Sequence, residues 1–196
     1  MSTTLKVLIA ASAMLVSSAV VQAAPITVTP SSPTPSCTGP GTGPDPSWIT
    51  TYCPSMGGLT QYYKQNVGGA EEGSLAGSYT SVFTGASGDE SGGTITWDGP
   101  AAIDCPTCWL MVKDGSATPG RYAFDLSSIW DGRSTITLSG FWAGTSGAIS
   151  HWALYGKDIC RVDCGPDRDL PTPGTLALVG LALAAVGAIS RRRRIK

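Results

Sequence analysis

The chain has 196 residues, a formal net charge of −1 and charged residues at only 14% of its positions. This small net charge hides an uneven distribution. All 14 acidic residues lie between Asp45 and Asp169, where the basic residues are only Lys64, Lys113, Arg121, Arg133, Lys157, Arg161 and Arg168. An acidic central region argues against nucleic-acid binding and against charge-driven binding of polyanionic polysaccharide, because counterion release needs clustered Lys and Arg.

The first 23 residues have the pattern of a signal peptide. Lys6 precedes an apolar and small-residue run over residues 7–21, and the run ends in the small-residue site Val21-Gln22-Ala23. This order of basic, apolar and small-residue regions predicts export and removal of residues 1–23. A membrane-spanning helix is the alternative, but serines interrupt the run and Pro25 follows it.

Residues 24–46 are rich in Pro, Ser, Thr and Gly and have little apolar surface to bury. We therefore expect a flexible or polyproline-like lead-in. Residues 47–163 have the length of one ordinary domain.

Polar and apolar residues alternate with a period of two in this domain, which favours strands over helices. We expect strands at residues 59–67, 78–84, 94–97, 109–113, 121–126, 134–138 and 149–155, separated by glycine-rich turns. Short strands at this spacing predict an all-β fold, a single antiparallel β-sandwich of jelly-roll type. The expected core is Leu75, Val82, Phe83, Ile95, Trp97, Leu110, Val112, Phe124, Leu126, Ile136, Leu138, Trp152 and Leu154.

The six cysteines all lie in the part of the chain expected to be exported. An even number in an oxidising compartment predicts disulfides, and sequence neighbours suggest three pairs out of fifteen connectivities. These are Cys37 with Cys53, Cys105 with Cys108, and Cys160 with Cys164. The first pair would stabilise the fold by about 3 kcal/mol and fix the lead-in to the domain.

The Cys105-Pro106-Thr107-Cys108 motif also has the spacing of thiol oxidoreductases and of half a zinc site, whose other half would be Cys160 and Cys164. A reactive thiolate needs a helix N-terminus or a cation beside it. The residues that follow, 109–112, have a strand pattern instead, which favours a structural disulfide.

The candidates for catalysis are few. His151 is the only histidine, lies inside an expected strand and has no Gly-x-Ser-x-Gly motif to accompany it, so we expect a structural role. Two pairs of carboxylates are adjacent in sequence, Glu71-Glu72 and Asp89-Glu90. Glycoside hydrolases use two carboxylates that lie a set distance apart across a sugar, and adjacency in sequence alone does not provide that distance. They could instead ligate Ca²⁺. We therefore expect no enzymatic activity, no catalytic residue and no resident metal or cofactor.

Three of the six tryptophans, Trp48, Trp130 and Trp142, flank turn or loop signals. Exposed aromatic rings suit sugar binding because they offer rigid apolar faces, so these three are candidate ligand aromatics. The alternative is that they pack over the ends of the sandwich.

The C-terminal tail combines a helix-breaking motif, an apolar segment and a basic end. After a polar linker that begins at residue 164, Pro171-Thr172-Pro173-Gly174 resists helix formation. Residues 175–190 carry no charge and would make a helix of about 24 Å, slightly shorter than the hydrocarbon core of a bilayer. A basic cytoplasmic end is expected from Arg191, Arg192, Arg193 and Arg194 by the positive-inside rule.

This tail resembles the sorting segment of the PEP-CTERM proteins, although Thr172 stands where that family usually has Glu. The resemblance implies processing by an exosortase, a membrane cysteine peptidase of Gram-negative bacteria that make extracellular polysaccharide. An ordinary, uncut anchor is the alternative. Residues 73–79, 112–115, 139–142 and 147–151 also look like a domain of some PEP-CTERM proteins, a likeness that implies no activity.

Together these features predict a protein sorted at the inner membrane and delivered to the cell surface or extracellular matrix. Its expected role is a structural or adhesive module associated with exopolysaccharide. The alternatives are a carbohydrate-binding module that uses exposed tryptophans and a carboxylate-dependent glycoside hydrolase. The expected partners are an exosortase, the membrane before processing, and extracellular polysaccharide, with no nucleic acid.

Overall fold

The computed structural model describes residues 24–143 and 147–161. The expected signal peptide, sorting motif, apolar tail segment and basic end lie outside these residues. Within the described ranges, no helix has the length and apolar character needed to cross a bilayer.

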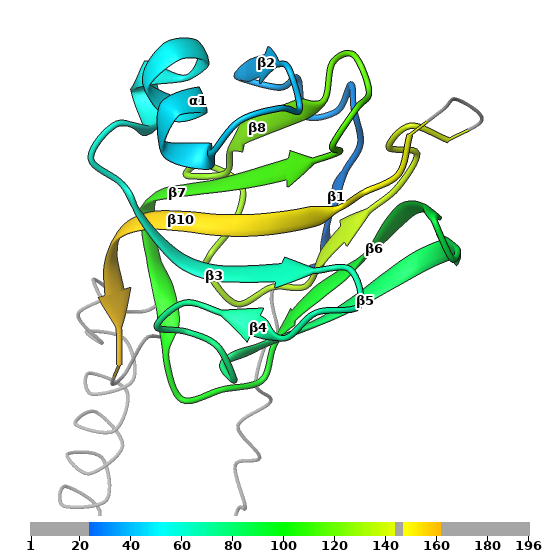
Figure 1. The fold of residues 1–196 in the computed structure, drawn as a ribbon. Coiled ribbons are helices and arrows are strands. Elements are labelled where there is room, and N and C mark those ends of the chain that lie inside the picture. The colour runs from blue at the N-terminus through cyan, green and yellow to red at the C-terminus, as the bar shows by residue number, and fades with distance from the viewer. Residues whose placement is uncertain (1–23, 144–146, 162–196) are drawn as a thin grey trace, which may run out of the picture.

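The described part of the chain is mostly β-strand, which confirms the expected all-β class (Figure 1). Its strands are β1 (Ile26–Val28), β2 (Cys37–Gly39), β3 (Thr60–Asn66), β4 (Glu71–Glu72), β5 (Tyr79–Ala86), β6 (Asp89–Trp97), β7 (Ala102–Lys113), β8 (Arg121–Asp125), β9 (Ile136–Leu138) and β10 (His151–Cys160). Its helical elements are α1 (Asp45–Tyr52) and the short 3₁₀ helix η1 (Pro54–Met56).

The strands form two sheets that pack face to face. Sheet A has the order β1-β9-β6-β5, and sheet B has the order β2-β8-β7-β10-β3-β4. All the pairings are antiparallel except that β1 runs parallel to β9. The expectation of a purely antiparallel fold is therefore wrong at this edge.

The expected lead-in, residues 24–46, belongs to the folded domain. It supplies β1 and β2, and the side chain of Val28 is fully buried in the main core. The short alternation of Ile26, Thr27 and Val28 is sufficient for one edge strand, although Pro and Ser around it obscure the pattern. The prediction of a flexible segment is therefore wrong.

The main core lies between the sheets and contains most of the expected residues, including Leu110, Phe124, Leu138 and Trp152. Val82 is the exception, because its side chain is 55% exposed on the outer face of sheet A. Neighbouring strand residues point to opposite faces, so Val82 and Phe83 cannot both point inward. Phe83 points inward and stacks on Trp152, with 3.9 Å between ring centroids.

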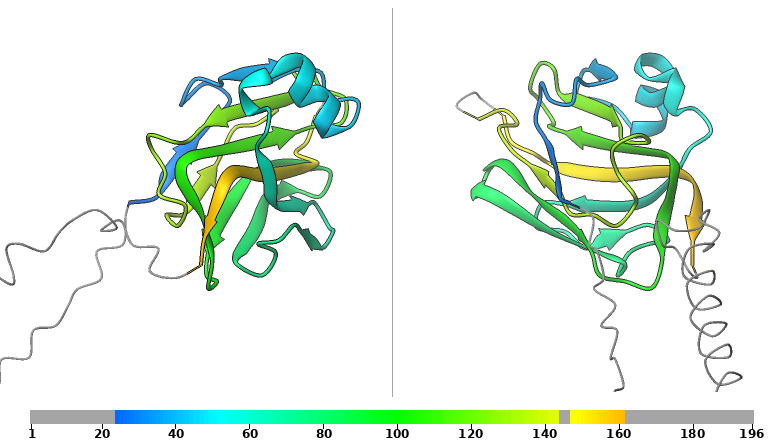
Figure 2. Two further views of the ribbon diagram at one scale, coloured as in Figure 1. Left: turned by 90° about the vertical axis from the view of Figure 1, so that its left-hand side faces the viewer. Right: turned by 180° about the vertical axis from the view of Figure 1, so that it is seen from behind.

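A second core covers the outer face of sheet B and was not expected from the sequence. Helix α1 lies over this face, opposite sheet A (Figure 2), and encloses Trp109, Met111, Ala153 and Tyr155. Strand β7 is therefore covered on both sides, which explains its uninterrupted apolar run.

Candidate functional site

The disulfides that the sequence suggested are present where the structure describes both partners. Cys37 is bonded to Cys53, and Cys105 is bonded to Cys108. Cys160 is also disulfide-bonded, but its expected partner Cys164 lies outside the described residues. No described cysteine is free.

The Cys105–Cys108 disulfide closes a bulge in β7. Asp104 pairs with Asp158 and Cys108 pairs with Gly156, so three residues of β7 lie opposite Lys157 alone. Both strands bend sharply in this region and continue along the edge of the sandwich (Figure 1). A bulge bends its strand, and here the disulfide holds the ends of the bulge 5.2 Å apart between Cα atoms.

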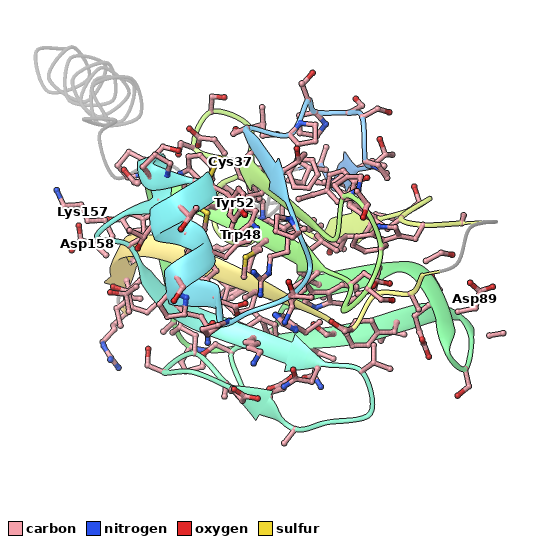
Figure 3. All side chains as sticks on the ribbon, turned by 45° about the horizontal axis from the view of Figure 1, so that its top comes forward. Cys37, Trp48, Tyr52, Asp89, Lys157 and Asp158 are labelled. Carbon is pink, nitrogen blue, oxygen red and sulfur yellow. A yellow bond between two sulfur atoms is a disulfide. The ribbon has the colours of Figure 1, made fainter. Side chains whose placement is uncertain are left out.

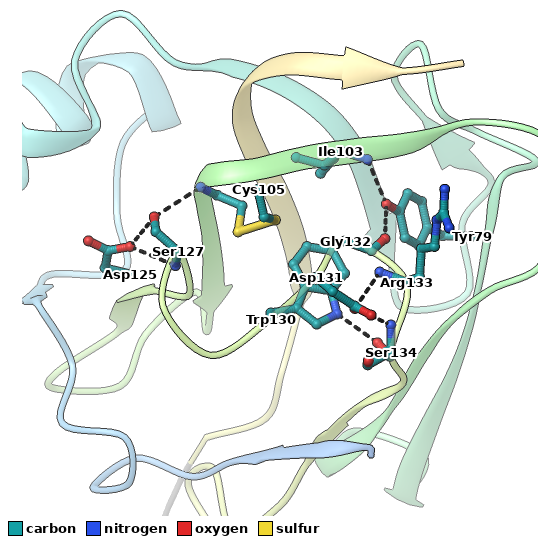
Figure 4. Close-up of a disulfide and its surroundings, with 11 residues drawn as sticks. Tyr79, Ile103, Cys105, Asp125, Ser127, Trp130, Asp131, Gly132, Arg133 and Ser134 are labelled. Carbon is teal, nitrogen blue, oxygen red and sulfur yellow. Dashed lines mark hydrogen bonds between the residues drawn. A yellow bond between two sulfur atoms is a disulfide. The ribbon is translucent and has the colours of Figure 1, made fainter. Parts of the chain in front are cut away.

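Buried hydrogen bonds join this corner to sheet A (Figure 4). The Tyr79 hydroxyl donates to the Gly132 carbonyl at 2.7 Å and accepts from the Ile103 amide at 3.0 Å. Within the part of the fold that belongs to sheet B, the Cys108 amide also donates to the Ser127 hydroxyl in the loop after β8, at 3.2 Å. The arrangement explains the Cys-x-x-Cys motif as a structural feature of the corner.

The three candidate ligand tryptophans are buried, which agrees with the alternative that they pack and not with exposed ligand faces. The exposed fractions are 2% for Trp48, 4% for Trp130 and 7% for Trp142. The indole N–H groups of Trp130 and Trp142 donate to the carbonyls of Ser134 and Pro119, at 2.6 and 2.8 Å. Trp48 stacks on Tyr52 within α1, beside Cys37 (Figure 3). Packing at the sandwich ends and under the helix is therefore their structural role.

Trp142 nevertheless lines a cavity of about 530 Å³. We call this cavity the Trp142 cleft, and its lining is Pro30, Ser116, Ala117, Thr118, Tyr122, Gly140, Trp142 and Ala143. The rings of Tyr122 and Trp142 lie 5.5 Å apart between centroids. The cleft thus combines an aromatic pair with the exposed hydroxyl-bearing residues Ser116 and Thr118.

The backbone around Trp142 is unusual. Gly140 has a φ of 75° and Trp142 has a φ of 54°, in the left-handed region that bulky side chains rarely occupy. The Phe141 amide between them donates to the Ser91 carbonyl at 2.9 Å, and the Phe141 side chain is fully buried. These contacts hold a turn that directs the Trp142 ring toward Tyr122.

Asp114 joins the two loops that flank the cleft. Its carboxylate accepts hydrogen bonds from the amides of Ser116 and Ala117 in one loop and from the amide of Ala148 in the other. Burial works to raise the pKa of Asp114, but these amide donors outweigh it and the pKa lies below its ordinary value of 3.8. The pair Asp114-Gly115 is a local turn signal in the sequence, whereas the bridge to Ala148 has no local signal.

A cluster of charged groups lies under the N-terminus of α1. Arg121 is fully buried, and its guanidinium lies 2.9 Å from the Asp45 carboxylate, which is 3.4 Å from the imidazole of His151. Strand pairing aligns Arg121 with Lys113 and Lys113 with His151, so three basic residues form a row on this face.

The charges of this cluster hold α1 on sheet B. Burial works to raise the pKa of Asp45, but the neighbouring His151 and the charge of Arg121 lower it below 3.8 overall. Burial and the neighbouring charge of Arg121 also lower the pKa of Lys113. Arg121 donates further to the carbonyls of Thr42 and Gly43. His151 therefore has a structural contact, as its position inside a strand suggested.

The paired carboxylates have separate partners. Glu71 accepts from the Tyr63 hydroxyl and the Gly77 amide, whereas Glu72 lies 3.5 Å from the Lys64 ammonium. Asp89 and Glu90 begin β6, at the end of the molecule away from Lys157 and Asp158 (Figure 3). In the described ranges, no three His, Cys, Asp or Glu side chains come together as metal ligands.

These features define a disulfide-stabilised two-sheet β-protein with an aromatic cleft between loops at one end. No family model, curated protein or solved structure matches the chain.

Proposed function

We propose that this protein is an exported β-sandwich module of the cell surface or extracellular matrix, sorted through its PEP-CTERM-like tail. One observation carries the proposal: every described cysteine is disulfide-bonded. Structural disulfides persist in oxidising compartments and are rare in the cytosol of mesophiles. The order of signal-peptide pattern, proline motif, apolar segment and arginines agrees with the same route.

The position of the Trp142 cleft supports a role at a surface. The first described residue and the last strand both lie at the end of the sandwich that carries the Cys105–Cys108 disulfide. Ala24 and Cys105 line a cavity of about 450 Å³ there, and Cys160 pairs with Ala102. The Trp142 cleft lies at the other end, next to the loop between β7 and β8. A domain tethered through its C-terminus would thus present the cleft away from the membrane.

The sorting route is tested by the double variant Pro171→Ala/Pro173→Ala. The expected result is full-length protein retained in the membrane fraction, because the helix-breaking motif that marks the processing site is gone. Pro166→Ala is the matched control in the same linker and leaves processing unchanged. Normal processing of the double variant would refute the proposed motif.

We also propose that the Trp142 cleft binds a polysaccharide segment. Its volume is in the range of small-ligand sites, and its aromatic pair with nearby hydroxyl groups has the chemistry of sugar recognition. Its lining residues carry no charge, which favours neutral sugars.

Blocking the cleft tests this proposal. Ser116 is exposed at the cleft, so Ser116→Phe fills it without disturbing the core. Ser128→Phe is the matched control, because Ser128 is exposed at the cavity of the opposite end. Titration with a neutral polysaccharide should quench tryptophan fluorescence in the wild type and in Ser128→Phe, but not in Ser116→Phe. An acidic polysaccharide should quench the wild type less than the neutral one does. Equal responses in all three proteins would exclude the cleft as the binding site.

A further inference from the structure

Three of the four sheet edges in the described chain have features that prevent pairing with another strand. Strands β1 and β2 are three residues long and have prolines close by, and β4 consists of Glu71 and Glu72 alone. Short length, proline and charge are the usual protections of exposed edges.

Strand β5 forms the fourth edge and has neither charge nor proline. It is the last strand of sheet A and runs over Tyr79–Ala86 with the sequence YTSVFTGA. Its register with β6 is unbroken from Tyr79 to Thr84, and a bulge follows. In an antiparallel edge strand, alternate residues direct their N–H and C=O groups away from the sheet. This edge can therefore accept another strand.

The side chains on the outer face of β5 are small or apolar and leave room for another strand beside β5. Thr80, Val82 and Thr84 are exposed on the outer face, and Val82 is the largest apolar residue among them. The next outward residues on β6, Thr94 and Thr96, are uncharged too. One carboxylate lies at the beginning of this face, because Asp98 accepts a hydrogen bond from the Thr80 hydroxyl at 2.6 Å. In a domain whose acidic residues outnumber its basic ones, the part of β5 around Val82 and Thr84 is therefore where two copies can approach with less charge repulsion.

We propose that two copies of this chain pair through β5, edge to edge and antiparallel, to make one continuous sheet. Each copy supplies the same edge strand, so a two-fold axis between the copies lets both β5 edges form their hydrogen bonds in one interface. Pairing near Val82 would bring the two Val82 side chains together as a cross-strand apolar contact. This inference goes beyond the proposed function, because it depends on neither the tail nor the Trp142 cleft.

The test is sedimentation velocity of the full chain in detergent over a range of concentrations, with one lysine introduced at each of two positions. Val82→Lys adds a charge to the edge, whereas Thr27→Lys adds the same charge to the exposed face of β1, the opposite edge of sheet A. We expect a dimer whose dissociation constant rises at least about tenfold in Val82→Lys and is unchanged in Thr27→Lys. Amide hydrogen exchange of residues 79–86 should slow as the wild type dimerises.

Three results would overturn the proposal: a monomer at every concentration, a dimer indifferent to Val82→Lys, or equal weakening by both lysines. If Val82→Lys does not fold, Thr84→Lys places the charge at another exposed position of the same edge. Association through the tail alone would leave the exchange of residues 79–86 independent of concentration, and this outcome also refutes pairing through β5.

Discussion

Asp45 connects helix α1 to sheet B. It begins the helix, contacts the buried Arg121 and lies beside His151, so one side chain links the helix to two strands of sheet B. The Asp45-Pro46 pair is a recognisable helix start, but α1 has only eight residues and is too short for a clear periodic pattern. The partners of Asp45 are 76 and more residues away in the chain, so sequence reasoning could not assign them.

Asp45→Asn should lower the free energy of unfolding by about 2 to 4 kcal/mol at neutral pH, because it leaves the buried Arg121 without its counter-ion. The folded-state pKa of Asp45 is lowered, so the stability it contributes is present above its ordinary pKa. That contribution is lost as the pH falls from about 4 through the lowered folded-state pKa.

Urea denaturation at a series of pH values, from neutral pH to below the ordinary pKa of Asp45, measures the free energy of unfolding of the variant and of the wild type. The variant should show a smaller loss of stability on acidification than the wild type. Asp89→Asn, at an exposed position of the β5–β6 hairpin, is the control and should behave as the wild type does. An Asp45→Asn protein as stable as the control would contradict the assigned role of the ion pair.

Replacing Trp142 by glycine changes the free energy of unfolding in two opposite ways. Removing a buried aromatic ring costs about 3 to 5 kcal/mol, whereas relieving a left-handed backbone with glycine recovers only about 1 kcal/mol. Trp142→Gly should therefore be destabilised by about 2 to 4 kcal/mol in urea denaturation. Trp142→Phe keeps most of the ring and should lose less. A glycine variant more stable than the wild type would show that backbone strain outweighs packing at this turn.

The elements divide into those with a clear sequence pattern and those without one. All seven expected strands are present, because alternation over several residues and glycine-rich turns are local signals. Strands β1, β2 and β4 and helices α1 and η1 were missed, since each is short and depends on packing against distant parts of the chain. The Cys105-x-x-Cys108 disulfide was predicted, but the bulge that it closes became evident only from the pairing of β7 with β10.

The two described disulfides should differ in their contribution to stability. Cys37–Cys53 spans 16 positions and Cys105–Cys108 spans three. The chain-entropy relation gives about 3 kcal/mol for the longer loop and about 2 kcal/mol for the shorter. Cys53 and Cys108 are fully buried, so paired alanine substitutions avoid burying a polar group.

Thermal and urea unfolding of Cys37→Ala/Cys53→Ala and Cys105→Ala/Cys108→Ala will test this order. The larger loss is expected for the first pair, which fastens the segment before α1 to the end of that helix. If the second pair costs more, the corner of β7 and β10 contributes stability beyond loop closure.

At the scale of the whole molecule, the two ends of the sandwich differ. One end has the Cys105–Cys108 corner and the first and last described residues (Figures 1 and 2). The other end has the Trp142 cleft. The all-β class and the disulfides followed from composition, alternation and cysteine spacing. The cleft did not, because its lining comes from three loops and from strand β8, which are far apart in the chain. Trp142 was the one cleft residue that the sequence named as a candidate ligand aromatic, and its ring is buried.

The most direct test of the proposed export and sorting is the intact mass of the protein from membrane, cell-surface and culture fractions, before and after reduction. We predict a mature chain that begins near Ala24, ends near Pro173 and gains about 2 Da for each reduced disulfide. A chain that keeps residues 1–23 and its complete basic tail, or one whose mass does not change on reduction, would contradict the account.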